Sequence, residues 1–216
     1  MGQTGSGKTT LIKDKVLPDL PEPVFILDPM HEYQPGRDGI LYTGDLEGCH
    51  RNPAREFVRL VQSGNSKVLQ AGRHVFRLRK TDADIENVQD VLEAQAEDVL
   101  GILDRAGQSG TIVIDETDLF SNATRALDPI ENMVMRGRHA EQNLVFSYRR
   151  PSRVSKSITS ESHVALCFHL RENDAVRFRD LGNADRITSL GQYEYVALGA
   201  VDRAPYSPNL EPATVG

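Results

Sequence analysis

The sequence feature that most constrains this chain lies at its start, where residues 2–9 fit the spacing G-x-x-x-x-G-K-[ST] of a phosphate-binding loop. Glycines let such a loop wrap closely, so that its N–H groups point at phosphates. Lys8 is expected to reach the β- and γ-phosphates, and the Thr9 hydroxyl to ligate Mg²⁺. We therefore predict an ATP–Mg²⁺ site. The predicted nucleotide contacts are Gly2, Gln3, Thr4, Gly5, Ser6, Gly7, Lys8, Thr9 and Thr10.

The position of this loop is unusual, because only Met1 precedes it. A phosphate-binding loop normally follows a buried parallel strand. If the central strand were missing, the fold would lose about 1.5–3 kcal/mol of stability for each aliphatic side chain that the strand would have buried. We expect Met1 to be the last residue of such a strand, and the start of the chain to be truncated or misassigned.

A second motif lies near the middle of the chain, where four apolar residues, 111–114, precede two acids. At the carboxyl end of a buried strand, Asp115 is expected to bind Mg²⁺. Glu116 is expected to polarise a water molecule for attack on the γ-phosphorus. This acidic pair favours hydrolysis over phosphoryl transfer to a small acceptor, since nucleotide kinases usually need no base at that position.

Apolar runs and helical periodicities alternate along the chain, which predicts an α/β fold with a mostly parallel sheet and helices on both faces. Strands are expected at 24–27, 40–42, 68–70, 75–78, 111–114, 144–147, 164–168 and 193–198. Helices are expected at 7–17, 53–62, 82–103, 129–139 and 173–181. Residues 1–200 are expected to form one ATPase domain, and the proline-containing segment 201–216 a disordered tail.

Composition narrows the protein class further. The 216 residues carry a formal net charge of −6, which argues against a nucleic-acid coat protein but not against a ring with basic residues around its pore. No apolar run approaches the roughly 20 residues that cross a bilayer, and the N-terminus does not resemble a signal peptide. Cys49 and Cys167 lie far apart in the sequence, as expected for free thiols in a cytoplasmic protein.

Five segments together resemble the ATPase core of the FtsK/HerA superfamily: 2–10, 24–33, 111–116, 136–158 and 163–170. The resemblance covers most of residues 1–200. Its more specific parts are Asp28-Pro29 with Glu32-Tyr33, and the Arg-Pro-Ser block within 144–158. It implies a P-loop ATPase of the RecA/ASCE type that translocates DNA. The compact size, without a membrane or extra DNA-binding domain, is most similar to a viral genome-packaging ATPase.

The resemblance also implies partners. Members of this superfamily form rings, so we expect a hexamer with double-stranded DNA in its pore, in the host cytoplasm or associated with the virion, and a capsid vertex or membrane protein as a further partner. An arginine from the neighbouring subunit usually completes each site. The candidates are Arg136, Arg138 and Arg171. Candidate contacts to DNA phosphates are Arg153, Lys156 and a loop around Arg73-His74.

One departure from the family pattern concerns the sensor of the γ-phosphate. Family members typically place Thr-Gln where this chain has Tyr148-Arg149. Either Arg149 or Ser147 is then expected to supply the polar group. Two alternative functions stay open: an ATPase of the same superfamily acting in conjugation, secretion or phage assembly, and a small-molecule phosphotransferase.

Overall fold

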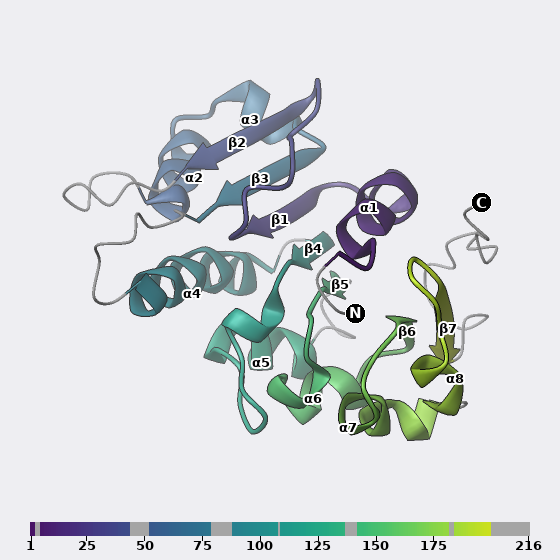
Figure 1. Cartoon of the computed structure of the whole chain (residues 1–216). Coiled ribbons are helices and arrows are strands. Elements are labelled where there is room, and N and C mark those ends of the chain that lie inside the picture. Colours follow the sequence, from purple (N-terminus) through teal and green to yellow (C-terminus); the bar gives the residue numbers. More distant parts are fainter. Residues whose placement is uncertain are drawn as a thin grey trace. The chain divides into compact units, whose positions relative to one another are not determined.

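The computed structural model describes residues 1–2, 5–43, 52–78, 88–107, 109–136, 142–181 and 184–199 (Figure 1). The chain divides into two compact units. The first comprises Met1–Leu20, Ser121–Ala126 and Ser147–Gly216, and the second comprises Pro21–Phe120 and Leu127–Phe146. The prediction for residues 201–216 lies outside the described residues.

The second unit contains a five-stranded sheet in which every neighbouring pair is parallel. Along the sheet the strand order is β2-β3-β1-β4-β5. The strands are β1 (Val24–Asp28), β2 (Gly39–Thr43), β3 (Arg73–Arg77), β4 (Gly110–Ile114) and β5 (Gln142–Phe146). The prediction of a mostly parallel sheet is confirmed.

The helices of this unit begin where the sequence supplies caps. The Asn52 side chain accepts a hydrogen bond from the Ala54 N–H at 2.9 Å, and Pro53 occupies the first helical position of α2. The predicted helix at 82–103 is observed from Val88, and residues 82–87 lie outside the described part. The helices are α2 (Pro53–Gln62), α3 (Ser66–Gln70), α4 (Val88–Ala106), the 3₁₀ turn Thr117–Leu119 and α5 (Asp128–Arg136).

The strand predicted at 68–70 is wrong, because these residues belong to helix α3. The Asn65 side chain accepts a hydrogen bond from the Lys67 N–H at 3.1 Å, and the Asn65 carbonyl accepts one from the Val68 N–H at 3.0 Å. Val68 is buried while Leu69 is exposed. A capping asparagine therefore decides the local structure, and two adjacent aliphatic residues do not.

The core of the second unit lies between the central strands and α4. Strands β1 and β4 are buried along their whole length, as expected for central strands of a parallel sheet. From α4, the predicted apolar stripe contributes Leu92, Ala96, Val99 and Leu103, all buried. The carboxyl ends of β1, β3 and β4 therefore meet at one well-supported edge.

The first unit carries the phosphate-binding loop and a two-stranded antiparallel sheet. Helix α1 (Lys8–Leu11) continues through a π-helical turn, Ile12–Val16, and a 3₁₀ turn, Leu17–Asp19, over the region predicted as one helix. The other elements are the 3₁₀ turn Pro151–Arg153, α6 (Lys156–Ser160), β6 (Val164–Phe168), α7 (Glu172–Ala175), the 3₁₀ helix Val176–Leu181, α8 (Ala184–Thr188) and β7 (Tyr195–Gly199).

Met1 pairs with β6 as a strand residue does. Its amino group donates to the Leu166 carbonyl at 2.8 Å, and its carbonyl accepts from the Phe168 N–H at 2.9 Å. These two bonds bracket Cys167 in the pattern of a parallel bridge. Burial raises the pKa of the Cys167 thiol to about 11, so the thiol is neutral. The backbone thus enters the phosphate-binding loop in an extended, paired conformation.

An aromatic cluster with a histidine at its centre fills one part of the second unit. His74 is 3% exposed, stacks on Phe25 with ring centroids 4.8 Å apart, and shares a 3.0 Å hydrogen bond between its Nδ1 and the Tyr42 hydroxyl. Phe57 and Phe76 complete the cluster. Burial lowers the pKa of His74 below its ordinary value.

The pKa shift of His74 predicts a pH-dependent stability. Below about pH 6.5 the unfolded chain takes up a proton at this residue while the folded chain resists it. The free energy of unfolding is therefore expected to fall between pH 7.5 and 5.5, by at most about 1.4 kcal/mol per pH unit from this group. Urea unfolding of the wild type and of His74→Phe combined with Tyr42→Phe measures this component. An identical pH dependence in both proteins would contradict it.

Candidate nucleotide-binding and hydrolysis site

The phosphate-binding loop has a backbone that requires glycine. Gly2 and Gly7 have φ angles of 153° and 92°, in a region that side chains disfavour. A Cβ atom on Gly2 would lie 2.6 Å from the Phe168 Cβ and 2.9 Å from the Ser6 Oγ. Space as well as conformation therefore excludes any other residue at this position. Gln3 and Thr4 lie outside the described residues.

Lys8 lies inside this loop rather than in solvent. It is 7% exposed, and its Nζ donates a hydrogen bond to the Gly2 carbonyl at 2.7 Å, so the loop closes around the ammonium group. The Gly7 carbonyl accepts from the Leu11 N–H at 2.8 Å, which begins the helix directly after the loop. Thr9 is half-buried and Thr10 exposed in the first turn of α1. A buried cation within a glycine-rich loop suits a phosphate group.

The acidic motif follows β4, as predicted. Asp115 is 2% exposed, and its N–H donates to the Leu27 carbonyl of β1 at 3.2 Å. The chain then turns sharply at Glu116, which adopts a left-handed conformation with φ 48° and ψ 46°. The Leu119 N–H donates to the Glu116 carbonyl at 2.8 Å, and the Thr117 hydroxyl to the Ile114 carbonyl at 2.9 Å. A non-glycine residue held in this conformation marks a strained turn.

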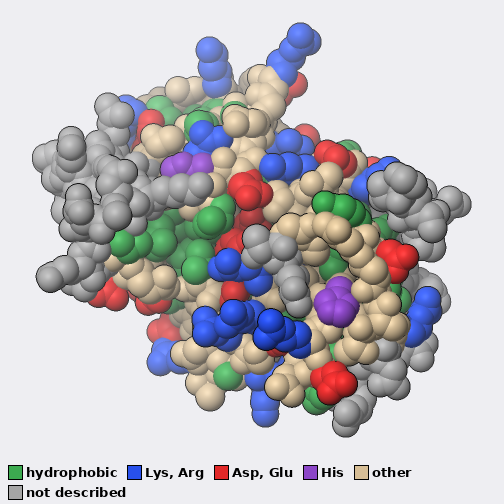
Figure 2. All heavy atoms as spheres, viewed as in Figure 1, with side chains coloured by type: hydrophobic (Ala, Val, Ile, Leu, Met, Phe, Trp, Pro, Cys, Tyr) green, Lys and Arg blue, Asp and Glu red, His purple; other side chains and the backbone are tan. Residues whose placement is uncertain are grey.

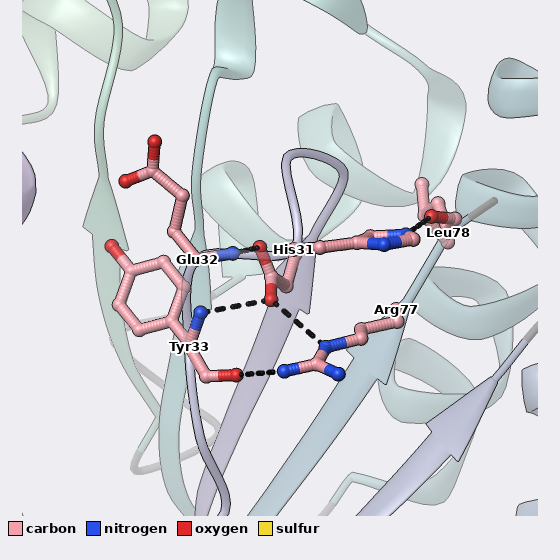
Figure 3. A network of polar contacts seen from close by, with 6 residues as sticks. His31, Glu32, Tyr33, Arg77 and Leu78 are labelled. Atoms are coloured by element: carbon pink, nitrogen blue, oxygen red, sulfur yellow. Dashed lines mark hydrogen bonds and ion pairs between the residues drawn. The ribbon is translucent and has the colours of Figure 1, made fainter. Parts of the chain in front are cut away.

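A polar network next to this motif explains the Asp-Pro and Glu-Tyr pairs of the sequence (Figure 3). The Asp28 carboxylate accepts hydrogen bonds from the N–H groups of Glu32 at 2.9 Å and Tyr33 at 3.0 Å. Arg77 forms an ion pair with Asp28 at 3.7 Å and donates to the Tyr33 carbonyl at 2.7 Å. The His31 ring nitrogen hydrogen-bonds to the Leu78 carbonyl. Asp28 therefore holds the loop after β1.

This network brings Tyr33 to the acidic motif. The Tyr33 ring is fully buried, and its hydroxyl lies within the electrostatic influence of the Asp115 carboxylate. Burial, with the charges of Asp115, Asp28 and Glu32, raises the pKa of Tyr33 well above its usual range. Tyr33 therefore stays protonated and remains a donor. Sequence reasoning singled out Asp28 and Tyr33 by resemblance but gave them no role, and it missed Arg77.

The donor set fits the expected cofactor. Thr9 offers a hydroxyl and Asp115 a carboxylate, which are the hard oxygen ligands that Mg²⁺ takes from proteins while keeping several waters. The loop glycines and Lys8 belong to the first compact unit, and Asp115, Glu116 and Tyr33 to the second.

The segment after β5 contains the two candidate sensor residues. Ser147 is buried, and within the described part of the chain its hydroxyl has no hydrogen-bond partner. Arg149 is half-buried. Tyr148, between them, accepts a hydrogen bond at its carbonyl from the Gly2 N–H at 3.3 Å. This segment therefore borders the beginning of the phosphate-binding loop within the first unit.

The three candidate arginines have different surroundings. The Arg136 side chain is 61% exposed and forms a two-oxygen contact with the Asp104 carboxylate, at 2.8 and 3.0 Å. Arg171 is exposed ahead of α7 and has no ion-pair partner among the residues that the structure describes. Arg138 lies outside those residues.

The proposed DNA contacts need one correction. Arg73 and His74 do not form a loop, because they begin the interior strand β3, and His74 is buried in the aromatic cluster. Arg153 and Lys156 are exposed around the start of α6. On the face drawn in Figure 2, Lys and Arg side chains stand in small groups with acidic side chains among them. Within the described residues, no helix is both long and apolar enough to span a bilayer.

Comparison with protein-family models and with curated proteins finds no match. Solved structures do match. The genome packaging NTPase B204 from Sulfolobus turreted icosahedral virus 2, in complex with sulfate, gives a TM-score of 0.57 at 16% identity, over 91% of this chain and 86% of B204. Its complex with ATP-gammaS gives a TM-score of 0.55 at 17% identity, over 91% of this chain and 87% of B204. The DNA-packaging ATPase B204 from Sulfolobus Turreted Icosahedral Virus gives a TM-score of 0.53 at 17% identity, over 91% of this chain and 88% of B204.

These similarities, with the all-parallel five-stranded sheet, confirm the predicted fold class. The chain has the α/β fold of P-loop NTPases, including NTPases whose structures hold ATP analogues.

Proposed function

We propose that this chain is an ATP-hydrolysing motor subunit that translocates double-stranded DNA during viral genome packaging. The observation that carries the proposal is the closed phosphate-binding loop, in which the buried Lys8 ammonium is held at the Gly2 carbonyl. The fold similarity to a genome packaging NTPase supports the packaging role.

In this proposal the loop amides and Lys8 hold the triphosphate, with Gln3 and Thr4 contributing as predicted from the sequence. Thr9 and Asp115 would hold Mg²⁺, which would neutralise phosphate charge and polarise the phosphorus–oxygen bonds. The buried Tyr33 side chain is proposed to hold the Asp115 carboxylate in place for the metal.

Glu116 is the proposed catalytic base. Its left-handed conformation ends β4 abruptly. There Glu116 accepts a hydrogen bond from the attacking water and takes its proton as the water oxygen bonds to the γ-phosphorus, while the bond from that phosphorus to the bridging oxygen breaks and ADP leaves. General-base assistance of this kind typically contributes about 10²–10⁴-fold in rate.

For the γ-phosphate sensor, the structure favours Ser147 over Arg149. A buried hydroxyl without a partner among the described residues is costly unless a ligand satisfies it. Arg149 is only half-buried and already has an interaction within the protein. Arg149 remains the alternative that the family pattern suggests.

A hexameric ring with DNA in its pore is the proposed assembly. Arg171 is preferred over Arg136 as the finger for the neighbouring site, since Arg136 must first leave the Asp104 carboxylate. Arg138 remains a further candidate. Arg153 and Lys156 are proposed to contact DNA phosphates, with affinity that falls as salt rises. A capsid vertex or membrane protein is the proposed docking partner.

Two substitutions separate binding from hydrolysis. Lys8→Ala is expected to abolish ATP binding, because the loop loses its cation. Glu116→Gln is expected to bind ATP normally and to lower turnover at least 100-fold, because the amide cannot accept the proton from water. Calorimetry measures the affinity for ATP, and the rate of phosphate release measures turnover. Glu97→Gln, on the exposed side of α4, is the control.

DNA dependence tests the motor. Double-stranded DNA is expected to stimulate wild-type phosphate release at low salt and less at high salt. A protein that stays monomeric and hydrolyses ATP at one rate with or without DNA would contradict the motor and favour an assembly or secretion ATPase. ATP-dependent transfer of phosphate to nucleosides would favour the phosphotransferase.

Because the turn at Glu116 is strained, replacing this residue by glycine is expected to stabilise the fold and to abolish its proposed function. Glu116→Gly relieves the left-handed conformation and is expected to raise the free energy of unfolding by about 1 kcal/mol while abolishing hydrolysis. Glu116→Gln keeps the Cβ atom and is expected to leave stability unchanged. Urea unfolding compares the three proteins. A destabilised glycine variant would show that the turn is not strained.

A further inference from the structure

A tyrosine in the turn before β7 lies against the phosphate-binding loop. Tyr193 is 50% exposed, and it is one of only a few large hydrophobic side chains in the described part of the chain that are exposed to this extent. Its backbone is left-handed, with φ 66°. The Gly191 N–H donates to the Glu194 Oε2 at 2.8 Å, and the Glu194 N–H to the Gly191 carbonyl at 3.3 Å. A tight turn therefore holds Tyr193 in a disfavoured conformation with half its surface in solvent.

The ring of Tyr193 borders Gly7, the residue that leads into Lys8. A Cβ atom on Gly7 would lie 3.3 Å from the Tyr193 Cδ1 and 3.7 Å from the Phe168 Cε1. Phe168 is buried and packs against Tyr195 at a ring-centroid distance of 5.6 Å. All four residues belong to the first compact unit. Phe168 thus supports the loop from inside, while Tyr193 is the exposed aromatic surface beside it.

Resting on the proposed function, we infer that Tyr193 is the stacking surface for the nucleoside part of the nucleotide whose phosphates occupy the loop. In the proposed function the phosphates lie at Gly7 and Lys8, so the ribose and base leave the loop past residues that border it, among which Tyr193, next to Gly7, is exposed. An exposed aromatic ring offers the base a π-face. The turn that holds Tyr193 keeps this ring at the loop before any nucleotide binds.

Stacking also predicts the specificity of the site. A ring face stacks on any base through its π-surface and does not contact the hydrogen-bonding edges, so it does not distinguish one base from another. Tyr193 is therefore expected to bind ATP and GTP about equally, and to contribute nothing to a triphosphate that lacks a nucleoside.

The test compares ATP with inorganic tripolyphosphate, each with Mg²⁺, by calorimetry. Tyr193→Ala is expected to weaken the affinity for ATP and for GTP about 10- to 100-fold, and to change the affinity for tripolyphosphate less than about 3-fold. Tyr193→Phe keeps the ring and is expected to bind ATP as the wild type does. Val176→Ala, which truncates another exposed apolar residue of the same unit, is the control and is expected to change neither affinity.

Each other outcome overturns the inference in a recognisable way. Equal weakening of ATP and tripolyphosphate would mean that Tyr193 supports the loop itself. Unchanged ATP affinity in Tyr193→Ala would mean that the nucleoside lies elsewhere. If wild-type protein binds neither ligand, the proposed function fails as well.

A fluorescence measurement provides an independent readout. The chain contains no tryptophan, so Tyr193→Trp introduces a single reporter at the turn. Its emission is expected to change on adding ATP and not on adding tripolyphosphate. The same response to both ligands, or to neither while calorimetry shows ATP binding, would overturn stacking.

Discussion

Parallel pairing between β1 and β4 is the constraint on which the candidate hydrolysis site depends. Leu27 and Ile114 are register partners, so Asp28 and Asp115 leave the sheet side by side at its carboxyl edge. The Asp115 N–H is fixed to the Leu27 carbonyl, and Asp28 holds the backbone of Glu32 and Tyr33. A register shift of one residue would turn these carboxylates to the opposite face and remove Tyr33 from Asp115.

The phosphate-binding loop depends on a different constraint, which is close packing of backbone against aromatic side chains. Phe168 leaves no room for a Cβ atom at Gly2, and Tyr193 and Phe168 approach Gly7. Lys8 then reaches back to the Gly2 carbonyl. The residues that shape this loop therefore come from its own glycines and from segments more than 150 residues away in sequence, β6 and the turn before β7.

Strain occurs at two of the residues to which roles are assigned. Glu116 and Tyr193 both have positive φ without being glycine. Such conformations persist only when the surrounding structure holds them, and they gather at functional sites. We have proposed a role in hydrolysis for Glu116 and a role in nucleoside binding for Tyr193.

Motif spacing and apolar runs were sufficient to predict the central strands, α2, α4 and the candidate chemistry of Lys8, Thr9, Asp115 and Glu116, because these signals are local. Local signals misled at 68–70, where the capping of Asn65 outweighs two aliphatic residues, and at His74, whose burial depends on Tyr42 and Phe25 in other strands. The roles of Tyr33, Arg77 and Tyr193 arise from contacts between residues distant in sequence. What the sequence by itself determined is the presence of the phosphate-binding and acidic motifs, since glycine spacing and adjacent acids are properties of short segments. Only the tertiary structure decided that Tyr33 lies near Asp115 and that an exposed ring borders the phosphate-binding loop, because strand register and packing bring those residues together.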